Sequence, residues 1–497
     1  MQTKKALLPL ALLSAAGNAG MASPAARQQS RKPNLIFIVV DDLGWGGFGL
    51  NNRGYDYTCL NREFIDLFVD DYTPQEALEA ADKAIPTLSQ LCNRGTRFTN
   101  AYASANVSSA SRAGILTSRY QERFGYYINE EQAAGIPQDV KLMPQVLHDN
   151  GYATACIGKW HVGPESARAK GDCLEGYHPL DRGFDYYWGF NNSTSKYYNS
   201  PLLHKGREHV EATGYLTDEL TREAIGFIDR TKEKPFMIYL AYNAMHGPLQ
   251  FPAPKEYLDR FDYGSERLNN YYAYLFAVDT GVKRILEELQ RTGLDNNTMI
   301  AFVSDNGAPG TKIDVLPKNG PLRGFKGQTW QGGVRIPMFI YAPGMKNDFV
   351  SEEIVSTMDV FPTFMDYAGI ALPEKIDGRS LLPLLKGRSH KVRDYMIWVG
   401  QNAGCWGMFK TKDQKTALGS FMVCSKEWSM RYDAETQTFS LYNLRKDIGE
   451  KQDVAAKYPA QVEKMCRVFR QWYSEMAAPM IWNKKYWGGV EYWNNPQ

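Results

Sequence analysis

The chain has 497 residues, of which 43% are hydrophobic and 13% aromatic, and this suits an ordered globular protein with one large domain and a smaller one. Its formal net charge of +2 argues against nucleic acid or an anionic membrane surface as the partner. None of the seven cysteines forms the closely spaced pair of a zinc site, and the one disulfide that we expect joins Cys405 to Cys424.

The N-terminus has the pattern of a secretory signal. Lys4 and Lys5 precede an apolar run, residues 6–16, which is too short to span a bilayer. We therefore expect a signal peptide over residues 1–22, a leader over 23–30, and a periplasmic or secreted protein. The alternative is a disordered N-terminal tail, and no other stretch is long enough for a membrane helix.

Apolar runs alternate with helical patterns from residue 34 to about residue 370. The predicted buried strands are residues 35–40, 152–157, 236–242, 300–303 and 338–341. The predicted helices between them include residues 143–150, 217–232 and 271–292. This alternation is typical of an α/β domain with a large, mostly parallel sheet sandwiched by helices, and we assign residues 31–385 to it. Residues 51–84 interrupt the pattern, either as a helix-containing flap over a pocket or as a surface insertion without a role.

The pattern changes after about residue 372. A turn and a short helix are expected at residues 377–383. Strand-like segments follow at residues 395–399, 406–409, 421–424, 428–432 and 439–442, and a helix is expected over 459–476. The spacing predicts a smaller C-terminal α+β subdomain, residues 386–497, on a four-stranded antiparallel sheet.

Polar side chains follow four of the predicted strands in the large domain. In chain order these side chains are Asp41 and Asp42, Lys159 and His161, His246, and Asp305 and Asn306. A single loop of this kind is usually only solvated, but the carboxyl ends of parallel strands meet at one edge, where ligands bind. The sequence therefore predicts a site at this edge.

Two groups of residues suggest the chemistry of that site. The acids and the amide, Asp41, Asp42, Asp305 and Asn306, offer only oxygen ligands, which favour Ca²⁺ or Mg²⁺, although the paired aspartates could also cap a loop. Ser108 is expected at a helix N-terminus, where backbone N–H groups attract anions, with Arg112 one turn later. Lys159, His161, His246 and Lys326 add donors, so the set matches cleavage of a sulfate or phosphate ester. Alone, His161 could equally well be a packed histidine and His246 a turn residue, and Lys326 would usually be a surface lysine.

These segments resemble the type I, formylglycine-dependent sulfatases of the alkaline phosphatase superfamily. The family signature, Cys/Ser-x-Pro/Ala-Ser-Arg-x-x-x-Leu-Thr-Gly-Arg, stands here as SSASRAGILTSR over residues 108–119. Family blocks are also resembled, in family order, by residues 34–44, 158–163, 246–248, 304–307 and 323–337. The resemblance implies an alkaline phosphatase-like fold and hydrolysis of sulfate esters.

The resemblance also implies roles for the site residues. Ser108 would be oxidised to formylglycine, whose hydrate carries two hydroxyl groups, one to attack sulfur and one to expel sulfate. One Ca²⁺ ion per chain would be bound by Asp41, Asp42, Ser108, Asp305 and Asn306. Arg112 and Lys159 would hold the formylglycine and sulfate, and His161 would assist sulfate expulsion. His246, with Lys326, would protonate the leaving alcohol.

Four departures from the family pattern matter. Ser108 in place of the commoner cysteine implies an anaerobic-type formylglycine-generating maturation enzyme and a bacterial host. Ala110 replaces the usual proline, a variant that such maturation enzymes accept. Ser118 stands for a common glycine, and Gln331 stands for a common glutamate. None of the four removes a catalytic group.

The substrate is expected to be a sulfated oligosaccharide or monosaccharide. Residues 123–129 and the long-range pattern look closest to galactosamine-sulfatase-like carbohydrate sulfatases of this family. We expect exo-acting removal of sulfate, with the 6-O position favoured, from a galactose-type or hexosamine residue of host glycans. The alternatives are a phosphoesterase of the same superfamily and a non-catalytic glycan-binding relative with an unmodified Ser108.

Overall fold

The central strand, β1 (Asn34–Val40), is an uninterrupted run of buried residues, as expected for a strand covered on both faces. It belongs to a computed structural model that describes residues 32–55, 71–166, 171–310, 318–400, 420–434 and 436–481. The predicted signal peptide and leader lie outside these residues. Within the part that is described, no helix has both the length and the apolar character that a membrane span requires.

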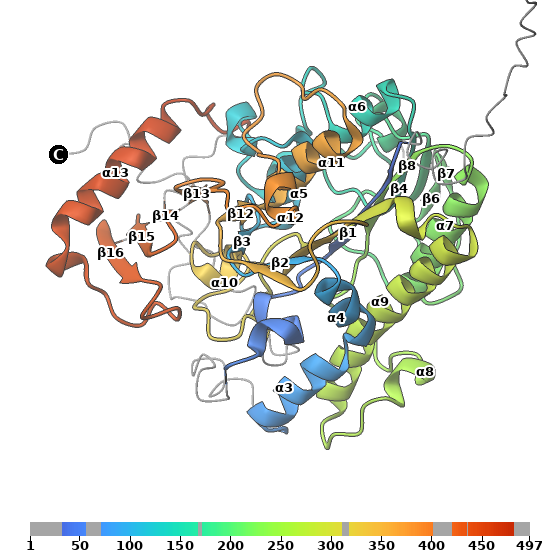
Figure 1. The fold of residues 1–497 in the computed structure, drawn as a ribbon, viewed down its shortest axis with the longest axis horizontal. Helices are drawn as coiled ribbons and strands as arrows, with labels where there is room; N and C mark the ends of the chain where they lie inside the picture. The colour runs from blue at the N-terminus through green and yellow to red at the C-terminus, as the bar shows by residue number, and fades with distance from the viewer. Residues whose placement is uncertain are drawn as a thin grey trace, which may run out of the picture. The chain divides into compact units, whose positions relative to one another are not determined.

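The main sheet has ten strands (Figure 1). Their spatial order is β11 (Phe349–Ser351), β2 (Thr96–Phe98), β10 (Met338–Tyr341), β9 (Thr298–Ser304), β1, β8 (Phe236–Ala241), β4 (Ala153–Lys159), β5 (Tyr186–Phe190), β6 (His204–Lys205) and β7 (Glu208–His209). The central strands β9, β1, β8, β4 and β5 run parallel, whereas β10 is antiparallel to β9, and β6 to β5. The mixed, mostly parallel sheet that the sequence predicts is therefore confirmed.

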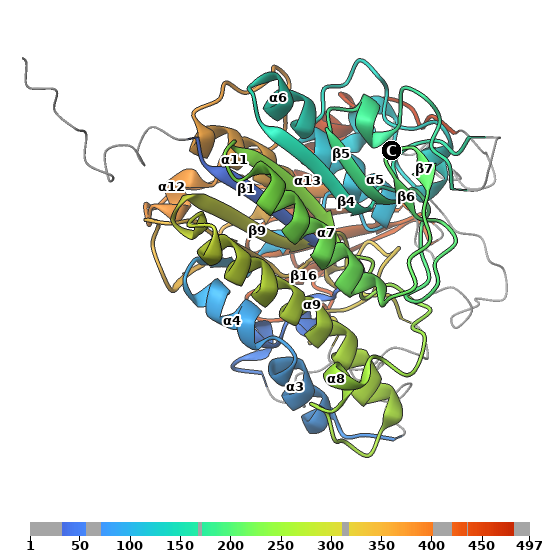
Figure 2. The same cartoon turned by 90° about the vertical axis from the view of Figure 1, so that its right-hand side faces the viewer.

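Helices cover both faces of this sheet (Figure 2). One face carries α3 (Pro74–Lys83), α4 (Pro86–Asn93), α7 (Leu216–Thr231), α8 (Lys255–Leu258) and α9 (Glu266–Arg291). The other face carries α5 (Ser108–Thr117), α6 (Met143–Asp149), α11 (Val360–Ala368) and α12 (Leu382–Leu385). Short elements complete this part of the fold: β3 (Ala101–Tyr102), β12 (Val355–Ser356), α10 (Gln331–Val334), and 3₁₀ turns at Trp45–Gly47, Gly49–Asn52, Gln121–Phe124, Asn129–Ala133, Pro179–Asp181, Asp295–Asn297 and Thr357–Asp359.

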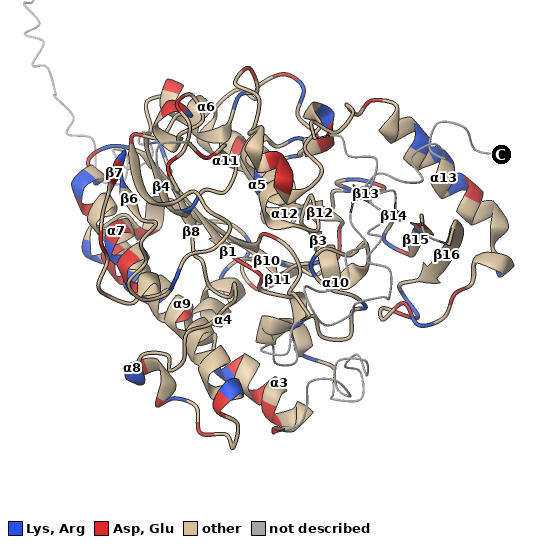
Figure 3. Cartoon of the chain, turned by 180° about the vertical axis from the view of Figure 1, so that it is seen from behind, with Lys and Arg blue, Asp and Glu red and all other residues tan. Residues whose placement is uncertain are grey.

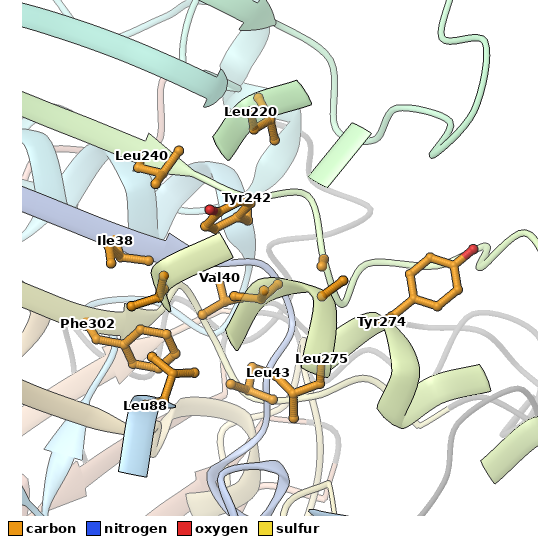
Figure 4. Close-up of a cluster of buried hydrophobic side chains, with 14 of the residues drawn as sticks. Ile38, Val40, Leu43, Leu88, Leu220, Leu240, Tyr242, Tyr274, Leu275 and Phe302 are labelled. Atoms are coloured by element: carbon orange, nitrogen blue, oxygen red, sulfur yellow. The ribbon is translucent and has the colours of Figure 1, made fainter. Parts of the chain in front are cut away.

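Alternating side chains of β1 divide between two hydrophobic cores, because successive residues of a strand point to opposite faces. Ile36, Ile38 and Val40 pack with α4, α7 and α9, and Figure 4 shows part of this cluster. Leu35, Phe37 and Val39 pack with α5, α6 and α11 on the other side. Charged residues of both signs lie instead along outer helices such as α7 and α13 (Pro459–Tyr473), as Figure 3 shows.

The C-terminal residues form a second, antiparallel sheet of four strands: β13 (Met396–Val399), β14 (Phe421–Cys424), β15 (Trp428–Asp433) and β16 (Thr438–Asn443). A 3₁₀ turn at Ala455–Lys457 leads into α13 (Pro459–Tyr473), which covers this sheet through a stacked pair of rings, Phe421 and Phe469, with centroids 3.6 Å apart. This confirms the predicted sheet, although the strand-like segment at residues 406–409 lies outside the described residues.

The expected disulfide is wrong. Cys424 is a buried free thiol in contact with the Tyr102 hydroxyl at 3.5 Å and with the Gln331 amide at 3.4 Å. Its partner in the prediction, Cys405, lies outside the described residues. Cys424 is therefore occupied by polar contacts from the main domain.

Candidate active site

The two aspartates that follow β1 lie at the carboxyl edge of the main sheet. The Asp41 N–H donates to the carbonyl of Ala244, after β8, at 2.8 Å. The Asp42 N–H donates to Oδ1 of Asp305, after β9, at 3.1 Å. Asp42 has φ of 61°, a conformation that non-glycine residues seldom adopt and that often marks functional sites.

The register between β1 and β9 brings the second acidic segment alongside the first. Val40 pairs with Ser304, so Asp305 and Asn306 emerge beside Asp41 and Asp42. The Asn306 amide donates to Oδ1 of Asp42 at 2.7 Å. Gly307 must be a glycine, because a Cβ there would lie 1.8 Å from the carbonyl oxygen of Gly332.

Ser108 is the first residue of α5 and is 1% exposed. Its Oγ donates to Oδ1 of Asp41 at 3.3 Å and to Oδ1 of Asn306 at 3.0 Å. The hydroxyl thus lies between the two acidic segments and at the positive end of the helix dipole. This position joins the sequence signature to the predicted metal ligands.

Arg112, one turn along α5, faces the same carboxylates. It donates from Nε and Nη2 to Oδ2 of Asp305, at 3.1 and 2.9 Å, and its Nη1 reaches the Lys159 carbonyl at 3.3 Å. Lys159, the last residue of β4, places Nζ 2.5 Å from Oδ2 of Asp41. Both cations are fully buried, so each depends on its carboxylate partner.

His161 continues from β4 in a left-handed conformation, with φ of 57°. The Ser109 hydroxyl donates to its backbone carbonyl at 2.7 Å, which ties the residue to α5. Its imidazole Nδ1 is buried and has no hydrogen-bond partner in the part of the chain that the structure describes. A buried polar atom of this kind indicates that a ligand or water completes the site.

His246 and Lys326 form the more open side of the cluster, because their side chains are 21% and 15% exposed. His246 Nδ1 donates to the Gly247 carbonyl at 2.6 Å, which leaves Nε2 facing Oδ2 of Asp42 at 3.8 Å. Lys326 Nζ lies 2.7 Å from Oδ1 of Asp42. The structure therefore brings together all ten of the side chains that the sequence singled out.

Residues of the C-terminal subdomain contact the loop that contains Lys326 and hold it in place. Two guanidinium groups, those of Arg323 and Arg431, contact the Trp330 ring at 3.9 and 4.5 Å from its centroid. The carboxylate of Glu450 accepts from the Gln331 N–H at 3.0 Å and from the Ser429 hydroxyl at 2.7 Å. Sequence analysis missed these supports, because the sequence carries no local sign of contacts over such long separations.

Two departures from the family pattern have structural explanations. Ser118 ends α5 in a left-handed conformation, which glycine adopts most easily, and its hydroxyl donates to the Met358 carbonyl at 2.8 Å. Gln331 accepts from the Tyr102 hydroxyl at 3.0 Å and donates to the Cys424 thiol. A glutamate at position 331 would lack that donated hydrogen.

The three buried carboxyl groups of the cluster differ in pKa. Burial and the neighbouring Asp305 raise the pKa of Asp41 to about 7, although Lys159 opposes this. Burial works against the charged form of Asp42 as well, but Lys326 and His246 hold its pKa well below the usual range. The pKa of Asp305 is lowered, since Arg112 and Lys159 outweigh its burial. The neighbouring cations therefore stabilise the charged forms of Asp42 and Asp305 but do not overcome the burial of Asp41.

The histidines and Lys326 differ in protonation. Burial, with Lys159 and Arg112, moves the pKa of His161 well below its ordinary value. Burial and Lys326 lower the pKa of His246 to about 3. Burial opposes the charged form of Lys326, but the attraction of Asp42 raises its pKa. Both imidazoles are therefore neutral at neutral pH, and Lys326 carries a proton.

The donor set fits a hard divalent cation. Asp41, Asp42 and the His246 imidazole offer ligand atoms within 4.8 Å of one another, and the oxygens of Asp305 and Asn306 lie beside them. Carboxylate and amide oxygens are the ligands that Ca²⁺ and Mg²⁺ prefer. Arg112, Lys159 and Lys326 equal the three carboxylates in number, so a divalent cation would leave the site positive and ready for an anion.

One polar residue near this cluster was not predicted as a site residue. Asn243 is 1% exposed, and both polar atoms of its amide lack a hydrogen-bond partner among the described residues. It follows β8 in the loop that carries His246. Its place after a strand end was the only sequence signal, and that signal did not separate it from an ordinary loop asparagine.

Comparison with known proteins gives a consistent result. The Sulfatase family profile matches residues 33–370, and the profile described as "N-sulphoglucosamine sulphohydrolase, C-terminal" matches residues 326–475. The chain is 38% identical to the "Uncharacterized sulfatase YdeN" of Escherichia coli K12, over 92% of this chain and 88% of that protein. It is 31% identical to the N-acetylgalactosamine-6-sulfatase of Homo sapiens, over 74% of this chain and 68% of that protein.

A solved structure resembles the whole fold. It is the crystal structure of Ps i-CgsB in complex with k-i-k-neocarrahexaose. The two chains are 28% identical and superpose with a TM-score of 0.73, over 94% of this chain and 98% of the other.

Proposed function

The chain belongs to the sulfatase family of sulfuric ester hydrolases, and we propose that it removes sulfate from a sugar residue by means of Ser108 after oxidation to formylglycine. The position of Ser108 carries this proposal. Its Oγ touches one acidic segment and one amide of the predicted metal site, at the N-terminus of a buried helix. A nucleophile there would have the metal on one side and buried cations on the other.

The modified residue and the metal supply the chemistry that ordinary side chains lack. Formylglycine, once hydrated, supplies two hydroxyl groups on one carbon, one for attack and one for release of sulfate. Ca²⁺ would be held by Asp41, Asp42, Asp305, Asn306 and residue 108, and it would neutralise negative charge near the reacting group. Conversion of Ser108 removes two hydrogens and requires a maturation enzyme, for which we propose the anaerobic type.

Arg112 and Lys159 position the anionic groups. Each is fully buried and held by a carboxylate, Arg112 by Asp305 and Lys159 by Asp41. Such fixed charges need little reorganisation when negative charge develops on the sulfuryl oxygens. Because its pKa lies well below the ordinary value, His161 is neutral in the free protein. It would accept the proton of the second hydroxyl group as sulfate leaves, since the negative charge of sulfate favours the protonated imidazole.

The residues on the more open side of the site, His246 and Lys326, would deliver a proton to the leaving alcohol. Lys326 holds its proton, because its interaction with Asp42 raises the pKa. His246 is neutral in the free protein, and a bound anion would favour its protonated form. The two side chains together form the acid that we propose for the leaving oxygen.

The substrate class is proposed from the relatives. The N-acetylgalactosamine-6-sulfatases are named for a 6-sulfated amino sugar, and Ps i-CgsB was crystallised with a neocarrahexaose. We propose exo-acting hydrolysis on a galactose-type or hexosamine residue of host glycans, with 6-O-sulfate preferred. Export under a signal peptide over residues 1–22, to a periplasmic or secreted location, belongs to the same proposal.

A panel of sulfated monosaccharides tests this function. Matured protein is incubated with galactose, N-acetylgalactosamine, glucosamine and N-acetylglucosamine, each sulfated at a single position, and released sulfate is measured by ion chromatography. The same sugars carrying phosphate serve as matched controls. Turnover of a 6-O-sulfated galactose-type or hexosamine substrate is expected. Preferential release of phosphate would favour a phosphoesterase, and binding without turnover would favour a glycan-binding protein.

A further inference from the structure

A second group of metal-ligating side chains lies at the β6–β7 edge of the main sheet. His204 of β6 and His209 of β7 face Asp172, in the segment between β4 and β5. Their ligand atoms all lie within 4.8 Å of one another. The Nε2 atoms of His204 and His209 approach the same oxygen, Oδ1 of Asp172, at 2.8 and 2.9 Å.

The hairpin geometry holds the two imidazoles together. In the antiparallel register His204 pairs directly with His209, and Lys205 pairs with Glu208. Directly opposite residues project from the same face of such a pair. The two ring centroids are 4.0 Å apart, and both rings contact the same carboxylate.

The hydrogen bonding of His204 determines which nitrogen faces the carboxylate as an acceptor. Its Nδ1 lies 3.1 Å from the Leu202 carbonyl, and because a carbonyl only accepts, Nδ1 carries the hydrogen. In the neutral ring, Nε2 therefore directs a lone pair at a carboxylate oxygen 2.8 Å away. Two acceptors at that distance repel each other unless a cation, either a proton or a metal ion, lies between them.

We propose that Asp172, His204 and His209 bind a divalent transition-metal ion of the zinc class. Two imidazoles and one carboxylate form the ligand set that zinc accepts, whereas Ca²⁺ prefers oxygen alone. A backbone carbonyl on the far nitrogen, as Leu202 provides for His204, orients metal-binding histidines. His209 is 46% exposed, so water can reach this cluster.

The expected role is structural. The segment that contains Asp172 continues from β4 and from the active-site residues Lys159 and His161. Its backbone is closed by a hydrogen bond from the Ser166 N–H to the Asp172 carbonyl at 2.7 Å. A metal ion on the Asp172 carboxylate would fasten this segment to the β6–β7 hairpin. The chain would then use one site made mainly of carboxylate and amide oxygens and a second site with two imidazoles, for two classes of ion.

Zinc titration of the whole chain tests this inference. The protein is stripped of metal and saturated with Ca²⁺, and Zn²⁺ alone is then added while calorimetry measures affinity and scanning fluorimetry measures the melting temperature. Zn²⁺ should raise the melting temperature of the wild type. His209→Ala, which changes an exposed side chain, and Asp172→Asn should each weaken zinc binding by about tenfold or more.

A matched control comes from His148, which lies 3.2 Å from Asp185 and has no third ligand among the described residues. His148→Ala should leave zinc binding unchanged. Without zinc, His209→Ala should keep the wild-type rate of sulfate release, which separates this site from the proposed function. Equal zinc binding by the wild type and His209→Ala would overturn the inference. Absence of zinc binding by the wild type would also overturn it, because a proton would then be the only cation in the cluster.

Discussion

Arg112 and Asp305 form a buried ion pair in which two guanidinium nitrogens, Nε and Nη2, donate to one carboxylate oxygen. The pair joins the second turn of α5 to the end of β9, so it links the helix that begins at Ser108 to the acidic edge of the sheet. Both side chains are fully buried. Neither charge can therefore lose its partner without a large cost in free energy.

Arg112→Lys should lower both stability and activity, because an ammonium group on a shorter reach cannot reproduce the two donated hydrogen bonds. Removing one partner of a buried pair typically costs about 3–5 kcal/mol, and because lysine keeps the positive charge, we expect a loss in the free energy of unfolding by urea that stays below this range. Arg467→Lys is the control, since the Arg467–Glu463 pair is exposed and should contribute about 0–1 kcal/mol. Equal stability of the two variants would contradict the buried-pair argument.

Ser108→Ala should abolish sulfate release and leave the melting temperature nearly unchanged. The substitution removes only the hydroxyl and its two hydrogen bonds, of which each contributes about 1 kcal/mol or less. Ser109→Ala is the matched control, because Ser109 bonds Tyr126 and the His161 carbonyl but is not the proposed nucleophile. It should reduce the rate without eliminating it. Measurable turnover by Ser108→Ala would disprove the assignment of the nucleophile.

Removal of the divalent ion should reduce both activity and stability. Asp41, Asp42 and Asp305 are buried together, so their repulsion returns when a cation is withdrawn. Ca²⁺ at about 100 times its Kd would stabilise the folded state by about 2.7 kcal/mol. Melting curves with EDTA, and then with added Ca²⁺, measure the difference, and Asp42→Asn should blunt the response to Ca²⁺. A melting temperature and rate unaffected by EDTA would argue against the proposed metal.

Glu450 should impose a pH dependence on stability. Burial raises its pKa from 4.5 to about 7, although Ser429 and Gln331 donate to it. Between those values the folded state keeps a proton that the unfolded state has lost, so this group's contribution to stability falls as pH rises from about 4.5 to about 7 and is constant above. The full loss is roughly 3 kcal/mol.

Glu450→Gln removes that titration, so the difference in unfolding free energy between variant and wild type should change across this pH range. Urea unfolding at intervals of half a pH unit measures it. Toward low pH, the difference in unfolding free energy between the wild type and Glu450→Gln should become constant. Two parallel curves from pH 4.5 to 7 would show that Glu450 does not titrate in this way.

The sequence predicted much of the main domain because its strands are continuous apolar runs and its site residues follow them directly. Asp41, Lys159, His246 and Asp305 could be assigned to one edge of the sheet before any coordinates, since parallel strands end together. This rule alone did not predict the contact between Ser108 and Asn306. That prediction depended on the family signature.

Other features depend on contacts that no local pattern encodes. Trp330 is fixed by Arg431 of β15, about one hundred residues away along the chain, and Asp172 meets His209 only because a short hairpin closes the sheet edge. The expected pairing of Cys424 failed for the same reason, since the thiol instead meets Tyr102 and Gln331 of the main domain.

The most direct test of the central claim relates the chemical state of residue 108 to the rate of sulfate release. Preparations matured to different extents are digested with trypsin, and mass spectrometry of the peptide over residues 98–112 gives the fraction of Ser108 that has lost two hydrogens, a decrease of about 2 Da. The proposed mechanism predicts a rate proportional to this fraction, with no turnover when it is zero. Full activity in a preparation whose Ser108 is entirely unmodified would contradict it.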